Sequence, residues 1–376
     1  MHEDMVMKSV LSNYTKNRDN NFNLVRFAAA LLVLYTHSYA LSIGTDKAEP
    51  LRSLLGITWG TIAVDVFFIT SGFLVTSSLV NRNNLLAFVW ARFLRVYPAL
   101  FVAVLFCVFL VGAYFTSFPV SEYLAHERVY KFLFNNATLV FGVEYFLPGV
   151  FVDVPYKYLV NGSLWTLPFE LEMYGCLCVI GSALLFIQKR IKRDILGFAF
   201  LTLAVVSVAA YLTHRFYPYL SNGLFLRLFS MFFMGAAFYI WKDKIVLSTK
   251  AFFVILSALL LSILDWRFFM VMYHISLAYL VLYIAYVPAG RIRQFNVIGD
   301  YSYGIYIYAF PVQQSVAALI KGVSVPVMMG LSFIITLALA VLSWHLVEKR
   351  SLAMKGGYRI FEAKLLALRK VIWRAD

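Results

Sequence analysis

The sequence predicts an all-α integral membrane protein, a bundle of about ten transmembrane helices with both termini in the cytoplasm. Three observations carry this prediction: the composition, the length of the apolar stretches and the distribution of Lys and Arg. Of the 376 residues, 62% are hydrophobic and 14% are charged, whereas a soluble domain usually holds about 45–50% apolar and about 25% charged residues. This composition excludes a soluble enzyme, a nucleic-acid-binding domain and a disordered protein.

Ten stretches approach the roughly 20 apolar residues that a helix needs to cross a bilayer, and the seventh is short for a crossing. In chain order they are 22–43, 57–80, 96–115, 164–187, 195–212, 222–241, 250–264, 268–287, 301–319 and 325–347. Because residues 1–21 are polar and the first apolar stretch is long enough to remain as a span, we expect no cleavable signal peptide there. These stretches divide the chain into a cytoplasmic N-terminal segment, a transmembrane domain with a periplasmic loop, and a basic cytoplasmic tail that forms an amphipathic helix on the inner leaflet. The expected ranges are 1–21, 22–348 with the loop at about 116–163, and 349–376.

Lys and Arg are distributed unequally between the two sides of these spans. With the N-terminus inside, 23 of the 33 basic residues lie in inner segments and 8 in outer segments. The positive-inside rule assigns the richer side to the cytoplasm. The net charge of +14 therefore indicates membrane orientation rather than a nucleic-acid site.

A few ionisable side chains fall inside the predicted spans, where each costs about 2.5–3.5 kcal/mol on insertion scales and is a candidate functional residue. These are Arg26, His37, Asp65, Glu170, Glu172 and Arg227. Arg26 and His37 lie on one face of the first helix, about 16 Å apart along its axis. An arginine reaching the headgroups and a histidine bonded to a neighbouring helix would also explain this pair.

Glu170 enters its span from the outer end, about 9 Å deep, which is close to the depth inferred for His37. The two side chains could therefore meet, either as an acid–base pair for catalysis or as a structural pair. Asp300 and Glu348 lie at span ends, where we expect them to face water.

Arg92 and Arg95 open the third predicted span with a spacing that puts both on one helix face. Two guanidiniums at the cytoplasmic boundary could hold phosphate groups. The positive-inside rule alone would also explain arginines at this position. The three cysteines lack His or acidic neighbours at metal-site spacing, so no metal site is predicted.

Five short motifs follow one another along nearly the whole chain. They are Arg26 with His37, 64–74 (VDVFFITSGFL), Arg92-Phe-Leu-Arg95 followed by Tyr97-Pro98, 163–174 (SLWTLPFELEMY) and 299–306 (GDYSYGIY). In this order they resemble acyltransferase family 3, bacterial membrane proteins that O-acylate surface polysaccharides, lipopolysaccharides and signalling glycolipids.

The resemblance implies a multi-pass protein of the bacterial inner membrane that uses an acyl-CoA, most often acetyl-CoA, as donor substrate and holds no bound cofactor. His37 would be the catalytic residue and Glu170 the motif acid, and Arg26, Arg92 and Arg95 would lie at the donor site. Many relatives carry a histidine where this chain has Ala309, so no role transfers to that position. Some relatives also append a periplasmic hydrolase-like domain, and here we expect the membrane domain or a separate partner to complete the transfer.

The function predicted from these residues is transfer of an acetyl group to a hydroxyl of a cell-surface or lipid-linked glycan. His37 would act as general base in a direct transfer, or would itself be acetylated in a two-step route. Glu170 would orient His37 or position the acceptor. Trp165, Asp65 and Tyr156 are candidates for acceptor binding, although an interfacial aromatic belt also explains the two aromatic residues.

The alternative function is a transporter or flippase of a lipid-linked glycan, with the buried charges lining its path. Transporters commonly show internal repeats, which this sequence lacks. The expected partners are acyl-CoA, a glycan or lipid-linked saccharide and the lipid bilayer, with no nucleic acid. The oligomeric state stays open.

Overall fold

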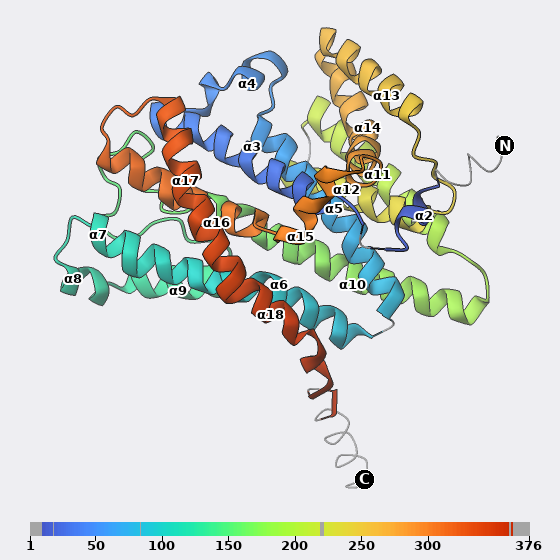
Figure 1. The fold of residues 1–376 in the computed structure, drawn as a ribbon, viewed down its shortest axis with the longest axis horizontal. Coiled ribbons are helices and arrows are strands. Elements are labelled where there is room, and N and C mark those ends of the chain that lie inside the picture. Colours follow the sequence, from blue (N-terminus) through green and yellow to red (C-terminus); the bar gives the residue numbers. More distant parts are fainter. Residues whose placement is uncertain (1–9, 18, 83, 219–221, 361, 364–376) are drawn as a thin grey trace.

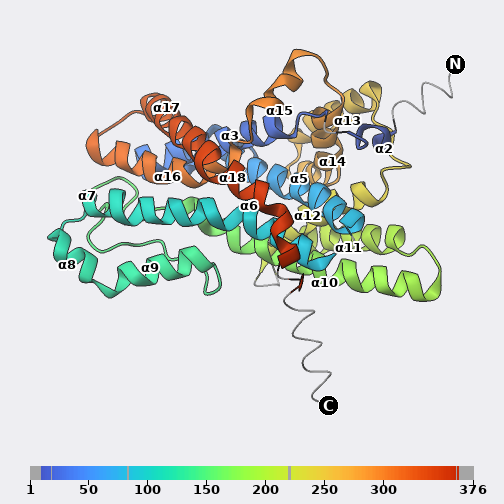
Figure 2. The same ribbon diagram turned by 60° about the horizontal axis from the view of Figure 1, so that its bottom comes forward.

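The computed structural model describes residues 10–17, 19–82, 84–218, 222–360 and 362–363. Figure 1 and Figure 2 show that this part of the chain is a bundle of helices, and no β-strand occurs in it. The helices that build the bundle are α3 (Phe22–Ile43), α5 (Trp59–Arg82), α6 (Leu85–Leu105), α10 (Thr166–Ile191), α11 (Leu196–Phe216), α12 (Gly223–Ile240), α13 (Thr249–Leu261), α14 (Trp266–Tyr286), α16 (Ser302–Leu319) and α17 (Val325–Ser343).

Each of the ten predicted spans corresponds to one of these helices, and the predicted class of all-α membrane protein is confirmed. Eight helices within the described residues are long and apolar enough to cross a membrane. The other two are α13, which is short, and α16. Every residue of α16 from Ser302 to Gln314 is buried. Since protein surrounds α16 on all sides, this helix tolerates the polar side chains Gln313 and Gln314, whose amide groups donate hydrogen bonds to neighbouring segments.

The third helix begins earlier than predicted. Asn84 caps α6, because its Oδ1 accepts a 2.9 Å hydrogen bond from the backbone N of Ala87. Arg92 and Arg95 therefore lie inside a continuous apolar helix that runs from Leu85 to Phe115. The predicted start at 96 is wrong. The two arginines suggest a boundary of the apolar stretch, whereas the bundle accommodates both guanidiniums within the helix.

Helices α5 and α12 cross at backbone contact. A Cβ atom at Gly72 would lie 1.9 Å from the carbonyl oxygen of Phe232, and one at Gly235 would lie 2.1 Å from that of Ile69. Small residues allow such close crossings between helices in membranes. This crossing fixes how the polar side chains of α5 and α12 meet.

The predicted loop at about 116–163 contains helices of its own. Helices α8 (Val120–Ala125) and α9 (Glu127–Thr138) follow α6 and its continuation, and α9 returns alongside α6 (Figure 2). The hydroxyl of Tyr97 in α6 donates a 3.0 Å hydrogen bond to the carbonyl oxygen of Thr138 at the end of α9. The loop is therefore packed against the bundle.

The terminal segments are described only in part. Helix α2 (Leu11–Tyr14) packs beside the segment that follows α12. Helix α18 (Lys349–Ala353) continues α17 through the π-helical segment Trp344–Glu348. Residues 1–9, and residues 361 and 364–376 of the predicted amphipathic tail, lie outside the described residues.

Candidate active site

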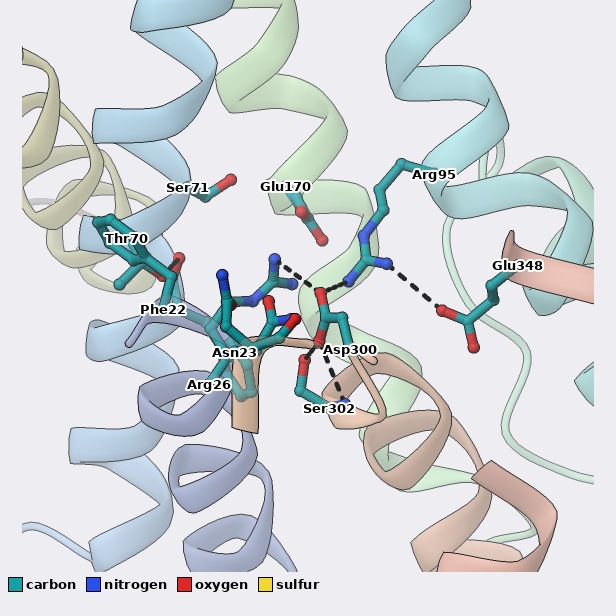
Figure 3. A network of polar contacts seen from close by, with 12 residues as sticks. Phe22, Asn23, Arg26, Thr70, Ser71, Arg95, Glu170, Asp300, Ser302 and Glu348 are labelled. Atoms are coloured by element: carbon teal, nitrogen blue, oxygen red, sulfur yellow. Dashed lines mark hydrogen bonds and ion pairs between the residues drawn. The ribbon is translucent and has the colours of Figure 1, made fainter. Parts of the chain in front are cut away.

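Two arginines and two carboxylates from four segments form a buried cluster, shown in Figure 3. Asp300 Oδ2 lies 2.6 Å from Arg95 Nη2 and 3.5 Å from Arg26 Nη1. Glu348 Oε2 lies 3.4 Å from Arg95 Nη1. The backbone N and the hydroxyl of Ser302 both donate to Asp300 Oδ1. Each guanidinium of the cluster thus has a carboxylate partner.

Asp300 and Glu348 do not face water, and that prediction is wrong. They are 8% and 2% exposed. A guanidinium removed from water needs an opposite charge and hydrogen bonds, and these two carboxylates supply them. Burial raises the pKa of Asp300, but the Arg95 and Arg26 guanidiniums outweigh burial and hold this pKa at about 2.

Arg92 lies outside this cluster. Its guanidinium lies over the ring of Tyr174, 5.8 Å from the ring centroid. Tyr174 donates a hydrogen bond to Glu170, one turn earlier in α10, and its hydroxyl lies 3.2 Å from that of Ser71. The structure therefore separates the two arginines of the third predicted span, with Arg95 in the cluster and Arg92 on the side of α10.

Glu170 and Arg26 line one small cavity of about 40 Å³, together with Ser71, Tyr303 and Tyr306. Glu170 and His37, whose depths would allow them to meet, form no hydrogen bond or ion pair with each other in the structure, and Glu170 accepts its hydrogen bond from Tyr174. Glu170 and Tyr174 share a face of α10, and this face points toward the arginines of α6. The side of the helix on which Glu170 lies, rather than its depth, decides its partner.

His37 opens onto a larger cavity that has Tyr306 in common with the Arg26 cavity. It has two adjoining parts of about 310 Å³ and about 470 Å³. Both parts are lined by Thr36, His37, Thr58, Thr61 and Trp165. The larger part extends to the polar segments Asp46, Arg52 and Tyr156, and the smaller part extends inward to Arg227.

The His37 ring is held by packing rather than by a carboxylate. Its centroid lies 5.1 Å from that of Phe310, with the two rings at 78°. Nδ1 of His37 has no hydrogen-bond partner among the described residues. Nδ1 itself is buried, but the ring forms part of the cavity wall. An imidazole held in place in such a wall is suited to exchange a proton with a bound molecule.

The three residues predicted to bind the acceptor divide into two groups. Trp165 and Tyr156 line the His37 cavity. Asp65 is fully buried, with Oδ1 3.4 Å from Arg227 Nε and Oδ2 accepting a 2.7 Å hydrogen bond from the Tyr273 hydroxyl. Asp65 thus holds Arg227, whose side chain reaches the cavity. The sequence made Arg227 a candidate functional residue because it lies inside a predicted span, but gave it no specific role.

Glu49 is a residue near His37 that the sequence did not single out. Its Oε1 accepts hydrogen bonds from Thr36 Oγ1 at 3.2 Å and from the backbone N of Trp59 at 2.6 Å. Burial raises the pKa of this carboxyl, and the two hydrogen bonds lower it in part. Glu49 fixes the Thr36 hydroxyl beside His37. Its position in a polar segment between two spans carried no sequence signal.

Comparison with known proteins identifies a family and two relatives that match most of the chain. The family model of the acyltransferase domain matches residues 19–345. The chain is 30% identical over 351 residues to the O-acetyl transferase of Shigella phage Sf6, an alignment that covers 89% of this chain and 97% of that protein. It is 28% identical over 369 residues to Nodulation protein 10 of Rhizobium leguminosarum bv. viciae, covering 92% and 96% of the two chains. No solved structure matches the chain.

Proposed function

The chain belongs to the acyltransferase family, and from this premise we propose that it transfers an acetyl group from cytoplasmic acetyl-CoA to a hydroxyl of a cell-surface or lipid-linked glycan. The similarity to a phage protein named O-acetyl transferase supports an oxygen acceptor and an acetyl group. The observation that carries the proposal is His37, whose ring lies in the wall of a cavity that Arg227 and Trp165 also line.

In the simplest mechanism His37 takes the proton from the acceptor hydroxyl while the hydroxyl oxygen attacks the thioester carbonyl. Arg227 stabilises the negative charge that develops on the carbonyl oxygen. The C–S bond then breaks, and the departing CoA sulfur takes the proton from His37. A two-step route through acetylated His37 uses the same residues.

The donor side of the proposed site is the Arg26 cavity. We assign Arg26 and Glu170 to it because both line that cavity. Arg95 holds Asp300 and Glu348, so we assign it to positioning the cluster around Arg26. The resemblance puts Arg92 at the donor, but its guanidinium lies outside the Arg26 cavity, over the ring of Tyr174, and we assign it no contact with the donor. Tyr306 lines both the Arg26 cavity and the His37 cavity, so a thioester would pass beside Tyr306 on its way from Arg26 to His37.

The acceptor side is the outer part of the His37 cavity. Trp165 and Tyr156 offer aromatic faces to a sugar ring, and Asp46 and Arg52 offer polar groups to its hydroxyls. This arrangement fits a protein of the bacterial inner membrane with both termini in the cytoplasm, which takes its donor from inside and its acceptor from outside.

The test is NMR of the O-acetyl groups on the host's surface polysaccharide, in cells that express His37→Gln at the wild-type level. We expect a loss of about 10²–10⁴-fold in the transfer rate, measured with purified protein and labelled acetyl-CoA. His126→Gln, which changes a histidine in the loop between α8 and α9, is the matched control and keeps full transfer.

Unchanged acetylation in His37→Gln would remove His37 from the mechanism. If deleting the protein removes the polysaccharide from the cell surface, rather than its acetyl groups, the chain is a flippase and the proposal is wrong.

A further inference from the structure

Helices α6 and α10 and the turn after α9 enclose a groove of about 950 Å³ that the proposed reaction does not use. Its walls are mostly apolar, and several of the side chains that form them lie open to the surroundings. Phe93 and Phe101 of α6 are 43% and 50% exposed, and Val179 of α10 is 72% exposed. Both helices belong to segments long and apolar enough to cross a membrane, so the groove opens sideways toward lipid.

Arg92 is the charged residue in the wall of this groove. Its guanidinium lies against Tyr174 and is attracted by Glu170, but Nε is buried without a hydrogen-bond partner, and no carboxylate of the described residues forms an ion pair with it. Asp300 and Glu348 are engaged by Arg95, and Glu170 accepts its hydrogen bond from Tyr174. A cation in a hydrocarbon environment is costly, so an anion from outside the chain would stabilise it.

We propose that the groove binds an anionic phospholipid of the surrounding bilayer, with an acyl chain between α6 and α10 and the phosphate at Arg92. The apolar walls fit a hydrocarbon chain, and a guanidinium binds a phosphate through two parallel hydrogen bonds. Acyl-CoA fits the groove less well, because its nucleotide and pantetheine need polar partners. The walls offer few of these besides Arg92, Thr138 and two tyrosine hydroxyls.

The bound lipid would lie close to the Arg26 cavity. Arg92 lies against Tyr174, which is bonded to Glu170 of the Arg26 cavity. A lipid phosphate at Arg92 would neutralise the guanidinium one side chain away from that cavity, and the acyl chain would close the gap between α6 and α10. This proposal concerns a binding site and does not depend on which group the protein transfers.

Gly175 allows a precise test. It lies in the wall of the groove, and a Cβ atom added there would meet nothing within 4 Å. The first atom of a larger side chain thus has room at position 175, and Gly175→Leu adds an apolar group to the wall of the groove. Gly330 in α17 is also an exposed helical glycine with open space around it, which makes Gly330→Leu the matched control. Both changes favour the helix, because glycine is a weak helix former.

The experiment is native mass spectrometry of the full chain in detergent with added phosphatidylglycerol or phosphatidylcholine. We expect the wild type and Gly330→Leu to bind phosphatidylglycerol about tenfold more tightly than phosphatidylcholine. Gly175→Leu should lose the bound lipid. Arg92→Gln should still bind lipid but lose the preference for the anionic headgroup, whereas Arg92→Lys should keep it.

Three outcomes would overturn the proposal. One is equal binding of phosphatidylglycerol to Gly175→Leu and Gly330→Leu. Another is equal affinity of the wild type for the two lipids. The last is displacement of phosphatidylglycerol by CoA alone, which would give the phosphate site of Arg92 to the donor. Because the readout is lipid binding, failure of the acyl-transfer proposal would leave these results interpretable.

Discussion

The Arg26 cluster and the His37 cavity differ in how their buried polar side chains are engaged by the rest of the protein. In the cluster, Arg26 and Arg95 each have a carboxylate partner and Ser302 donates to Asp300, although Nε of Arg26 has no hydrogen-bond partner among the described residues. In the cavity, the His37 ring rests against Phe310 and its Nδ1 is unengaged. The two regions are joined at the Tyr306 wall.

This difference separates stabilisation from chemistry. A buried charge that is fully paired contributes to the fold, and removing one partner is strongly destabilising. A buried group without a protein partner adds little to the fold, and the bound molecule is its natural partner. Arg95 and His37 thus represent two kinds of buried polar group, one that the chain itself neutralises and one that a bound molecule would engage.

The largest effect on stability is expected from Arg95→Met. This change leaves Glu348 without its ion pair and Asp300 with Arg26 alone, and we expect it to lower the free energy of unfolding by about 3–5 kcal/mol. His37→Gln should change it by less than about 0.5 kcal/mol. Thermal unfolding in detergent measures both, and equal melting temperatures for the two variants would contradict the comparison.

Acid should affect the cluster through Asp300. The pKa of this carboxyl is lowered from an ordinary 3.8 to about 2 by the guanidiniums of Arg95 and Arg26. A lowered pKa stabilises the folded state above about pH 4, and this stabilisation of about 2 kcal/mol is lost as the pH falls from about 4 to 2.

The measurement is the melting temperature between pH 5 and pH 2.5 for the wild type and Asp300→Asn. Asp300→Asn starts from a lower melting temperature but should lose less of it on acidification. Parallel pH curves for the two proteins would show that Asp300 does not carry this dependence.

A smaller effect is expected at the boundary of the His37 cavity, where Asp65 holds Arg227. Arg227→Met leaves Asp65 without its ion pair, and adding Asp65→Asn should restore about 1 kcal/mol in a double-mutant cycle. Asp65→Asn alone should lower the rate of transfer although Asp65 does not line the cavity. If Asp65→Asn changes the KM for the acceptor but not kcat, Arg227 binds the acceptor and does not stabilise the negative charge that develops on the thioester carbonyl oxygen.

Much of the fold could be predicted because a helix that crosses a bilayer must be apolar and about 20 residues long, and both properties can be read from neighbouring residues. The ten stretches found in the sequence all correspond to helices, and errors occur where a charge lies inside a helix, as at Arg92 and Arg95. The residues of the candidate site were also visible, because Arg26, His37 and Glu170 lie in stretches from which charges are usually excluded.

The partners of these residues could not be read from the sequence. Arg95 meets Asp300 across 205 positions of the chain and Glu348 across 253. Depth in the membrane suggested that Glu170 meets His37, but the rotation of α10 turns Glu170 toward Tyr174 and Arg26.

The sequence by itself determined the membrane class, the positions of the helices and the short set of charged residues that lipid would otherwise exclude. These depend on the apolar character and spacing of neighbouring residues. Only the tertiary structure decided which of these charges neutralise one another and which remain free beside a cavity. That division depends on how the helices rotate and cross, as α5 and α12 do at Gly72 and Gly235, and packing among distant segments sets those angles.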